Sequence, residues 1–319
     1  MSRRNRAVFP MNQQLRRAVY RLLLTAPMLP LWACGSDAGG CGVPLIYPII
    51  THANYTLPDG SQPAAGADCA PLCEALKERA ENCSLTSNGT STTLTCHSTV
   101  GHCYDGRRPE GLVERLAVGP DVLGAFYGQM AFLEAASVPA FLRLAEELEA
   151  HGAPASLVKA ARRSAGDEVR HARAAQALAR AHGAEVPEVE IAPFQPRSLW
   201  AMARENAVEG CVRELFGALV TGWQSRTAAD EEVRRVLGPI AEDELDHAEL
   251  AWAVDAWAQT KLSSAQQDEL RVARAQVLEE LRREHTTSDP SPELVRWAGL
   301  PSREAAVTLL SGLTDFATA

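Results

Sequence analysis

Apolar and small residues recur at helical spacing from about residue 119 to near the end of the chain, with charged residues between them. The pattern predicts helices at about 119–151, 154–182, 197–226, 228–260, 263–284 and 301–315. Ala, Leu, Glu and Arg dominate this part of the chain, and all four favour helices. We therefore predict an all-α domain over residues 111–319.

The ends of the predicted helices carry recognisable signals. The first two helices both end in Ala-His-Gly-Ala, around His151 and His182. A glycine just past the last turn permits a left-handed cap, and a histidine there faces the negative end of the helix. We interpret these two histidines as caps rather than metal ligands. Pro239, in the fourth helix, should break or kink that helix because proline lacks an amide hydrogen.

The segment between the second and third helices, residues 183–196, contains three prolines and should be extended. Its fourteen residues reach roughly 45 Å, close to the roughly 42 Å of a 28-residue helix. The segment can therefore run the full length of a bundle. This favours a four-helix bundle with one long crossover, with the two extra C-terminal helices packed outside it.

The N-terminal region has the pattern of an export signal. Residues 1–33 hold six arginines, no acidic residue and an apolar run at 22–33 that is too short to span a bilayer. The run ends in Leu-Trp-Ala-Cys, which resembles a bacterial lipoprotein signal in which Cys34 is lipidated and becomes the mature N-terminus. The alternative is a helix of the folded core, which the clustered arginines and two prolines disfavour.

The charge of the chain agrees with export and excludes one class of partner. Removing residues 1–33 takes the net charge from −9 to −15, because six arginines are lost. So acidic a chain is a poor binder of nucleic acid. We expect a membrane-anchored protein that faces the periplasm or the cell surface.

The cysteines between residues 41 and 103 predict a small disulfide-stabilised segment. These six residues would form three disulfides in an oxidising compartment, with no pairing favoured: Cys41, Cys69, Cys73, Cys83, Cys96 and Cys103. We predict a flexible tether over 34–68 and the cysteine-rich segment with its linker over 69–110. The alternative is a zinc site formed by Cys96, His97, His102 and Cys103. Cys211, in the third helix, is expected to be a buried free thiol.

Two Glu-x-x-His motifs carry the candidate chemistry, one at 168–171 and one at 244–247. A spacing of three places both side chains of a motif on one helix face, within reach of one ion. The motif alone would also fit a solvated face. However, the flanks repeat, since AGDEVRHA (165–172) and AEDELDHA (241–248) share five of eight positions.

Each motif follows a carboxylate on the preceding helix. Glu134 lies 34 residues before Glu168, and Glu209 lies 35 residues before Glu244. The spacing indicates an internal duplication of a helical hairpin. Six ionisable groups inside a bundle are very costly unless they are paired or metal-bound. We therefore predict two metal ions with these six ligands: Glu134, Glu168, His171, Glu209, Glu244 and His247.

Two further residues are candidate catalytic neighbours of this site. Glu205 lies one turn before Glu209 on the same helix face, with a structural hydrogen-bonding role as the alternative. Tyr127 shares a face with Glu134 and is a candidate redox-active or proton-donating group, with core packing as the alternative.

The ligand pattern resembles the di-iron carboxylate centre of the ferritin-like superfamily, which includes bacterioferritins and rubrerythrins. The resemblance covers roughly residues 119–260 and all six ligand positions. It implies two bridging carboxylates, Glu168 and Glu244, two terminal carboxylates, Glu134 and Glu209, and one histidine for each ion. It also implies iron, although iron–manganese and dimanganese pairs fit the same ligands.

Three functions fit these expectations. The first is an oxidoreductase that acts with dioxygen or peroxide on a small substrate, with an electron donor that the sequence does not identify. The second is iron oxidation or metal handling, in which iron is consumed. The third is a structural or partner-binding lipoprotein whose bundle is stabilised by metal. Fold resemblance alone does not choose among them.

Overall fold

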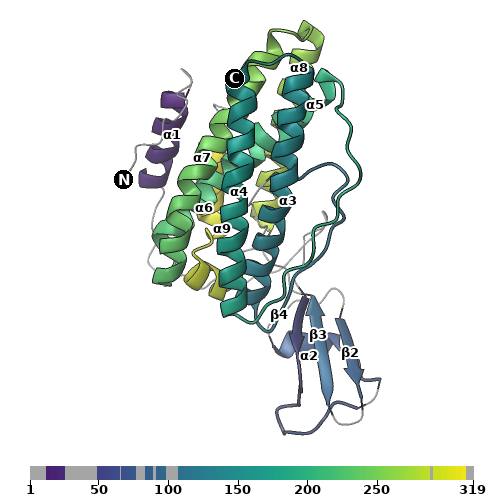
Figure 1. The fold of residues 1–319 in the computed structure, drawn as a ribbon. Coiled ribbons are helices and arrows are strands. Elements are labelled where there is room, and N and C mark those ends of the chain that lie inside the picture. The colour runs from purple at the N-terminus through teal and green to yellow at the C-terminus, as the bar shows by residue number, and fades with distance from the viewer. Residues whose placement is uncertain are drawn as a thin grey trace.

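The computed structural model describes residues 12–25, 49–64, 66–76, 83–88, 91–97, 107–287 and 290–313, and the described chain is mostly helical (Figure 1). The predicted lipidation site Cys34 lies outside these residues. So do Cys41, Cys103 and His102.

Two long helical hairpins form the centre of the molecule. Helix α3 (Val122–Ala150) packs tightly along α4 (Ala155–Ala181), and α6 (Leu215–Thr227) packs along α7 (Glu231–Gln259). Contacts between α4 and α7 join the two hairpins side by side (Figure 1). The arrangement is compatible with a helical bundle.

Helix α6 is the last part of a continuous helical segment that begins at α5. Helix α5 (Leu199–Glu205) continues into the π-helix η1 (Asn206–Glu214), which continues into α6. A π-helix holds more residues per turn than an α-helix, and it occurs frequently at functional sites. The predicted third helix is therefore present, with an interruption that the hydrophobic pattern did not reveal.

The predicted caps are confirmed. His151 and His182 are the C-caps of α3 and α4, and the glycine after each has a positive φ, +70° at Gly152 and +69° at Gly183. Pro239 does not break α7, which continues through it, and the predicted kink stays a prediction. Burial of the neighbouring Leu237 and Ile240 in the core offsets the missing backbone hydrogen bond.

The segment between α4 and α5 is extended, as predicted, and runs along the helices (Figure 1). Isolated β-bridges join Leu112 to Ile191 and Val118 to Glu185. Arg197 holds the C-terminal end of the extended segment. Its guanidinium donates hydrogen bonds of 2.7 and 2.8 Å to the two carboxylate oxygens of the buried Glu147.

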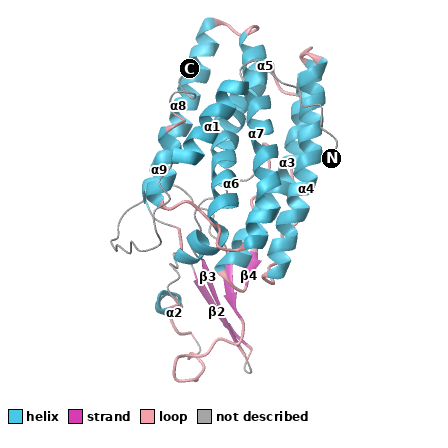
Figure 2. Cartoon of the chain, turned by 90° about the vertical axis from the view of Figure 1, so that its left-hand side faces the viewer, coloured by secondary structure: helices cyan, strands magenta, loops and turns pink. Residues whose placement is uncertain are grey.

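A small disulfide-bonded sheet lies at one end of the helices (Figure 2). Its strands β1 (Ile49–His52), β2 (Cys83–Ser87), β3 (Thr92–His97) and β4 (Val118–Gly119) have the order β2-β3-β1-β4. The sequence analysis predicted no sheet here. The Ser/Thr-rich segment forms the β2–β3 hairpin, because β-branched threonine fits a strand.

Two of the predicted disulfides are present, Cys69–Cys83 and Cys73–Cys96. They connect strands β2 and β3 to the helix α2 (Ala70–Ala75) and its start. The pairing of Cys96 with Cys73 excludes it from the alternative zinc site. Cys211 is a buried free cysteine, as predicted.

The remaining helices pack outside the two hairpins. Helix α8 (Ser264–Thr287) lies against η1 and α9 (Arg303–Ser311), with the π-helix η2 (Leu294–Ala298) between them in sequence. Helix α1 (Asn12–Thr25) lies against α6 and α7. It belongs to the predicted export signal, whose removal remains a prediction.

Among the described residues, no helix has both the length and the apolar character needed to cross a membrane.

Candidate metal centre

Five of the six predicted ligands lie together in the interior between α3, α4 and α7. All five are at most 2% exposed: Glu134, Glu168, His171, Glu244 and His247. One ligand atom from each of the first four lies within 4.8 Å of the others. The fifth is beside them, with Nδ1 of His247 3.1 Å from Oε1 of Glu168.

The apolar core is arranged around this group. On α3, one buried apolar cluster ends at Leu133 and a second begins at Phe141. On α4, the second cluster ends at Ala165 and the first resumes at Ala175. The candidate ligands of both helices fall in these two intervals. Apolar side chains therefore pack beyond the group toward both ends of the helices and shield it from water.

Each of the two histidines lies close to a glutamate of the other hairpin. Nδ1 of His171 lies 3.1 Å from Oε1 of Glu244 on the other hairpin and 3.7 Å from Oε2 of Glu168 on its own helix. Nδ1 of His247 lies 3.1 Å from Oε1 of Glu168 on the other hairpin and 3.6 Å from Oε2 of Glu244 on its own helix. Glu168 and Glu244 therefore lie between two imidazole rings whose centroids are 5.8 Å apart.

The other nitrogen of each histidine faces an aspartate that the sequence analysis did not single out. Nε2 of His171 lies 3.4 Å from Asp243, and Nε2 of His247 lies 3.7 Å from Asp167. Arg170 pairs with both aspartates, at 2.6 and 2.7 Å. Such outer carboxylates fix the orientation and tautomer of a metal-binding imidazole. Both aspartates are identical positions of the repeated flank, which is the signal that could have identified them.

Most of the atoms of this group that could bind a metal lack hydrogen-bond partners among the described residues. This holds for both oxygens of Glu134 and Glu168, for Oε1 of Glu244 and for Nδ1 of both histidines. Buried polar atoms are normally hydrogen-bonded. Carboxylate oxygens and imidazole nitrogens are also the ligands that iron, manganese and zinc accept. The buried Glu/His cluster could therefore hold metal.

The pKa values of three members of the cluster are raised, which favours their protonated forms. Burial and the nearby Glu168 carboxylate raise the pKa of Glu134 well above its usual value. Burial lowers the pKa of His171, but Glu134 and Asp243 raise it by more, so the net shift is upward. The pKa of His247 is raised in the same way, against burial, by Glu244 and Asp167. Metal binding would have to displace these protons.

The structure does not bring the sixth predicted ligand, Glu209, to the cluster. The Glu209 carboxylate is partly exposed and lies 3.5 Å from Arg213, one turn along η1. Burial raises its pKa, while the nearby Arg213 and Arg108 lower it.

Glu214, five residues further on, has the environment expected of the missing carboxylate. It is 2% exposed, and neither of its oxygens has a hydrogen-bond partner among the described residues. Burial raises the pKa of Glu214 to about 8, and its charged neighbours include His247, Glu244 and Glu168. The charges that act on Glu214 therefore include three members of the cluster.

The position of Glu214 follows from the hairpin turn. Glu214 lies 13 residues before the end of α6, and Glu244 lies 13 residues after the start of α7. Antiparallel helices place such residues at the same height. Glu209 would lie about 7.5 Å further along an α-helix. Spacing alone does not identify Glu214, since in the first hairpin Glu134 lies 16 residues before the end of α3 while Glu168 lies 13 residues after the start of α4.

The two candidate catalytic neighbours lie apart from the five clustered ligands. Glu205 forms an ion pair with Arg197 and lies 3.7 Å from Nε of Arg107. Tyr127 is buried near the start of α3, two turns before Glu134, with its ring 5.4 Å from that of His182. Burial and the nearby Asp230 raise the pKa of Tyr127. Any catalytic role for either residue remains a prediction.

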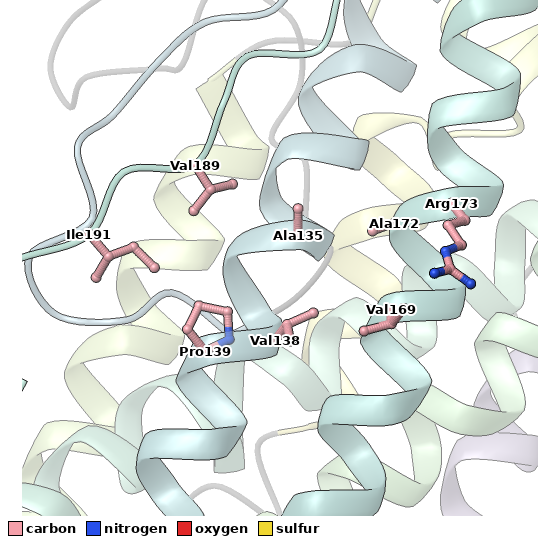
Figure 3. Close-up of a pocket in the computed structure, with 8 residues that line it drawn as sticks. All are labelled: Ala135, Val138, Pro139, Val169, Ala172, Arg173, Val189 and Ile191. Carbon is pink, nitrogen blue, oxygen red and sulfur yellow. The ribbon is translucent and has the colours of Figure 1, made fainter.

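An apolar groove of about 510 Å³ lies between α3, α4 and the extended crossover (Figure 3). Ala135, Val169 and Ala172 line it, and each directly follows a candidate ligand in sequence. Val189 and Ile191 of the crossover form the opposite side. The groove therefore follows the outer seam of the helix pair that supplies three of the ligands.

Comparisons of the chain with protein-family models, with curated proteins and with solved structures found no match. The protein is mostly helical and contains a buried Glu/His cluster that could bind metal.

Proposed function

We propose that the cluster holds two metal ions, with iron as the physiological metal, in a ferritin-like four-helix bundle, and that the protein is an oxidoreductase of the cell envelope. One observation carries the proposal. Three buried carboxylates and two imidazoles lie together, and the charges of His247, Glu244 and Glu168 act on a fourth buried carboxylate, Glu214. Most of their oxygen atoms, and the inner nitrogen of each imidazole, lack hydrogen-bond partners among the described residues. Such a group is very unfavourable unless protons or cations neutralise it.

The ligands divide into two sets. Glu134 and His171 would hold one ion, and Glu214 and His247 the other. Glu168 and Glu244, which lie between the two imidazoles, would contact both ions. Four carboxylates and two neutral histidines balance two divalent cations. This assignment keeps the predicted bridging and terminal roles and replaces Glu209 with Glu214.

The chemistry follows from the metal and from its protein surroundings. A bound pair of iron ions would supply the electrons that reduce dioxygen or peroxide. Asp243 accepts a hydrogen bond from the outer nitrogen of His171, and Asp167 faces that of His247 at 3.7 Å, so both favour inner nitrogens that are free for metal. The Phe141 ring, 4.9 Å from that of His247, excludes water from one side of the centre.

The disulfides support an envelope location. Cys69–Cys83 and Cys73–Cys96 are expected in an oxidising compartment and are rare in the cytosol. Together with the signal pattern before Cys34, they favour an exported lipoprotein anchored to the membrane through that residue.

The test is metal content by elemental mass spectrometry on purified protein loaded anaerobically with iron(II) or manganese(II). The variant Glu168→Ala/Glu244→Ala is compared with Glu146→Ala/Glu231→Ala, which removes two exposed carboxylates from the same bundle. We expect two ions per chain in the wild type and the control, and none in the cluster variant with its helical circular dichroism retained. Absence of stoichiometric metal from the wild type would refute the proposal.

Turnover then separates oxidation of a substrate from metal handling. An oxidoreductase keeps its two ions and continues to consume dioxygen when a reductant is supplied. A ferroxidase consumes dioxygen only in proportion to added iron(II). Oxygen uptake without further iron(II) is the expected result.

A further inference from the structure

A buried arginine lies beside the proposed centre. Arg107, in the segment that the sequence predicted to be a linker, is only 1% exposed. Its guanidinium lies 5.8 Å from the centre of the Phe141 ring, which in turn packs against His247. The linker therefore places a permanent positive charge in the interior, on the His247 side of the cluster.

Among the described residues, only one of the three guanidinium nitrogens of Arg107 has a hydrogen-bond partner. Nη2 of Arg107 donates a hydrogen bond of 3.0 Å to Oδ1 of Asn206. Nε faces Glu205 at 3.7 Å, which is too long for a hydrogen bond. Neither Nε nor Nη1 has a hydrogen-bond partner among the described residues. A buried guanidinium with unused donors is costly, so its retention calls for an acceptor.

The π-helix η1 is shaped around this group. A Cβ atom on Gly210 would lie 3.3 Å from Nη2 of Arg107 and 2.6 Å from Cβ of Ala251. Only glycine lets η1 approach both the arginine and α7 this closely. Asn206 also donates to the carbonyl oxygen of Ala251, at 2.9 Å, which fixes the amide that holds Arg107.

Glu214 does not supply the missing acceptor. Its carboxylate feels the charge of Arg107, yet no ion pair within 4.0 Å joins the two groups, and both of its oxygens lack hydrogen bonds in the described part of the chain. In the proposed function these oxygens serve a metal ion. In the described part of the chain the unused donors of Arg107 thus have no acceptor, which suits an anion from outside the chain.

We propose that Arg107 binds the carboxylate of the substrate, and that the substrate is a small apolar carboxylic acid. The planar fork of a guanidinium matches a carboxylate, which accepts two parallel hydrogen bonds. Phe141 and the surrounding apolar core suit an apolar remainder on such an acid. This inference rests on the proposed function, because it places the acid beside the metal centre.

The same charge opposes a second substrate class. A cation that approached from the Arg107 side would meet a buried positive charge in a low-dielectric interior. Iron(II) as a consumed substrate is therefore disfavoured on this side of the centre.

The test measures binding of hexanoate and 1-hexanol, which have the same chain length, by calorimetry on metal-loaded protein. The variant is Arg107→Gln, and the control is Arg108→Gln, which removes the adjacent arginine that faces Glu114 at the surface. We expect the wild type and the control to prefer hexanoate. In Arg107→Gln the hexanoate Kd should rise about tenfold or more, the loss of a charge-assisted hydrogen bond, with the hexanol Kd unchanged.

Metal content is measured first in every variant, so that failure of the proposed function is seen separately. If Arg107→Gln does not fold, Arg107→Lys replaces it. Arg107→Lys keeps the charge without the fork and should still weaken hexanoate binding several-fold. With two ions bound, the inference is overturned by a wild type that does not prefer hexanoate. It is equally overturned by a variant that binds hexanoate as the wild type does, in which case Arg107 only balances internal charge.

Discussion

At the scale of single residues, each candidate metal-binding histidine is held from two sides. Carboxylates of the cluster face the inner nitrogen, and an aspartate from the opposite hairpin faces the outer nitrogen. The outer contacts have no direct role in binding metal. Their effect is to select the imidazole tautomer and ring angle that leave Nδ1 free.

Replacing Asp243 with Asn should weaken metal binding by about 10–100-fold, because the imidazole of His171 loses its carboxylate partner. Competition with a chelator of known affinity measures the effect. Asp268→Asn, at an exposed position on α8, is the matched control and should bind metal as the wild type does. Equal affinities for all three proteins would show that the outer contact is dispensable.

Glu214→Ala should lose one of the two ions, whereas Glu209→Ala should keep both. The reason is that the charges of His247 and Glu244 act on Glu214, while Glu209 lies 3.5 Å from Arg213. Elemental analysis of the two variants after anaerobic loading distinguishes them. The opposite pattern would restore the assignment predicted from the spacing of the repeat.

Metal affinity should fall as the pH is lowered from 8 to 6. The metal-free cluster retains protons near neutrality, since Glu214 has a pKa of about 8 and the pKa values of both histidines are raised. Binding displaces these protons, so affinity changes by about tenfold per pH unit for each proton released. Calorimetry in buffers of different ionisation enthalpy counts them. A pH-independent affinity would mean that the cluster is already deprotonated.

The sequence predicted five members of the cluster and missed Glu214 for a physical reason. Residues on one regular helix can be placed by periodicity, which located Glu134 and both Glu-x-x-His motifs. The π-turns of η1 change the register of the third helix, and periodicity carries no information on such an interruption. Arg107 was missed because its segment has no period at all, and only tertiary packing brings it into the core.

At the scale of elements, η1 is the part of the bundle that departs most from regular geometry. Its π-turns allow Gly210 to approach Ala251 on α7 and bring Asn206, Cys211 and Glu214 to the interior. The long helices were predictable from their apolar periodicity, and the ends of α3 and α4 from their histidine and glycine caps. The β2–β3 hairpin was not, because short threonine-rich strands lack a strong alternation of apolar residues.

Gly210→Ala should destabilise the protein by about 1–3 kcal/mol, because the new methyl group would collide with Ala251. Gly238→Ala is the matched control on α7, where a Cβ atom meets nothing within 4 Å. That change should stabilise the helix by roughly 0.5–1 kcal/mol. Urea denaturation measures both. Equal and stabilising effects would mean that η1 and α7 are not in close contact.

At the scale of the whole molecule, the N-terminal region has two possible fates. Helix α1 packs against α6 and α7 and buries Leu15, Val19 and Leu23, and its Arg16 pairs with Asp246 and Glu249. The export pattern predicts that this helix is removed with the rest of residues 1–33. The mature protein would then expose the surface on α6 and α7 that α1 covers.

Protein recovered from bacterial membranes should begin at a lipid-modified Cys34 and should lack α1. Intact-mass spectrometry measures this, and Cys34→Ser should abolish both the lipid and membrane retention. The physical reason is that the anchoring lipid is attached to this one thiol. A full-length chain in the membrane-free fraction would show instead that α1 is a permanent part of the fold.

The crosswise Asp–His contacts have a consequence for how the molecule is built. Asp167 reaches His247, and Asp243 reaches His171, so exchanging the two hairpins leaves this set of contacts unchanged. That is the defining property of an isologous interface, here within one chain. One hairpin with its own Asp-Glu-x-x-His segment therefore already carries both halves of these contacts, and a second copy of itself could supply the rest. Arg107 and η1 break this two-fold relation between the hairpins, because each lies beside one hairpin and has no counterpart beside the other in the described part of the chain.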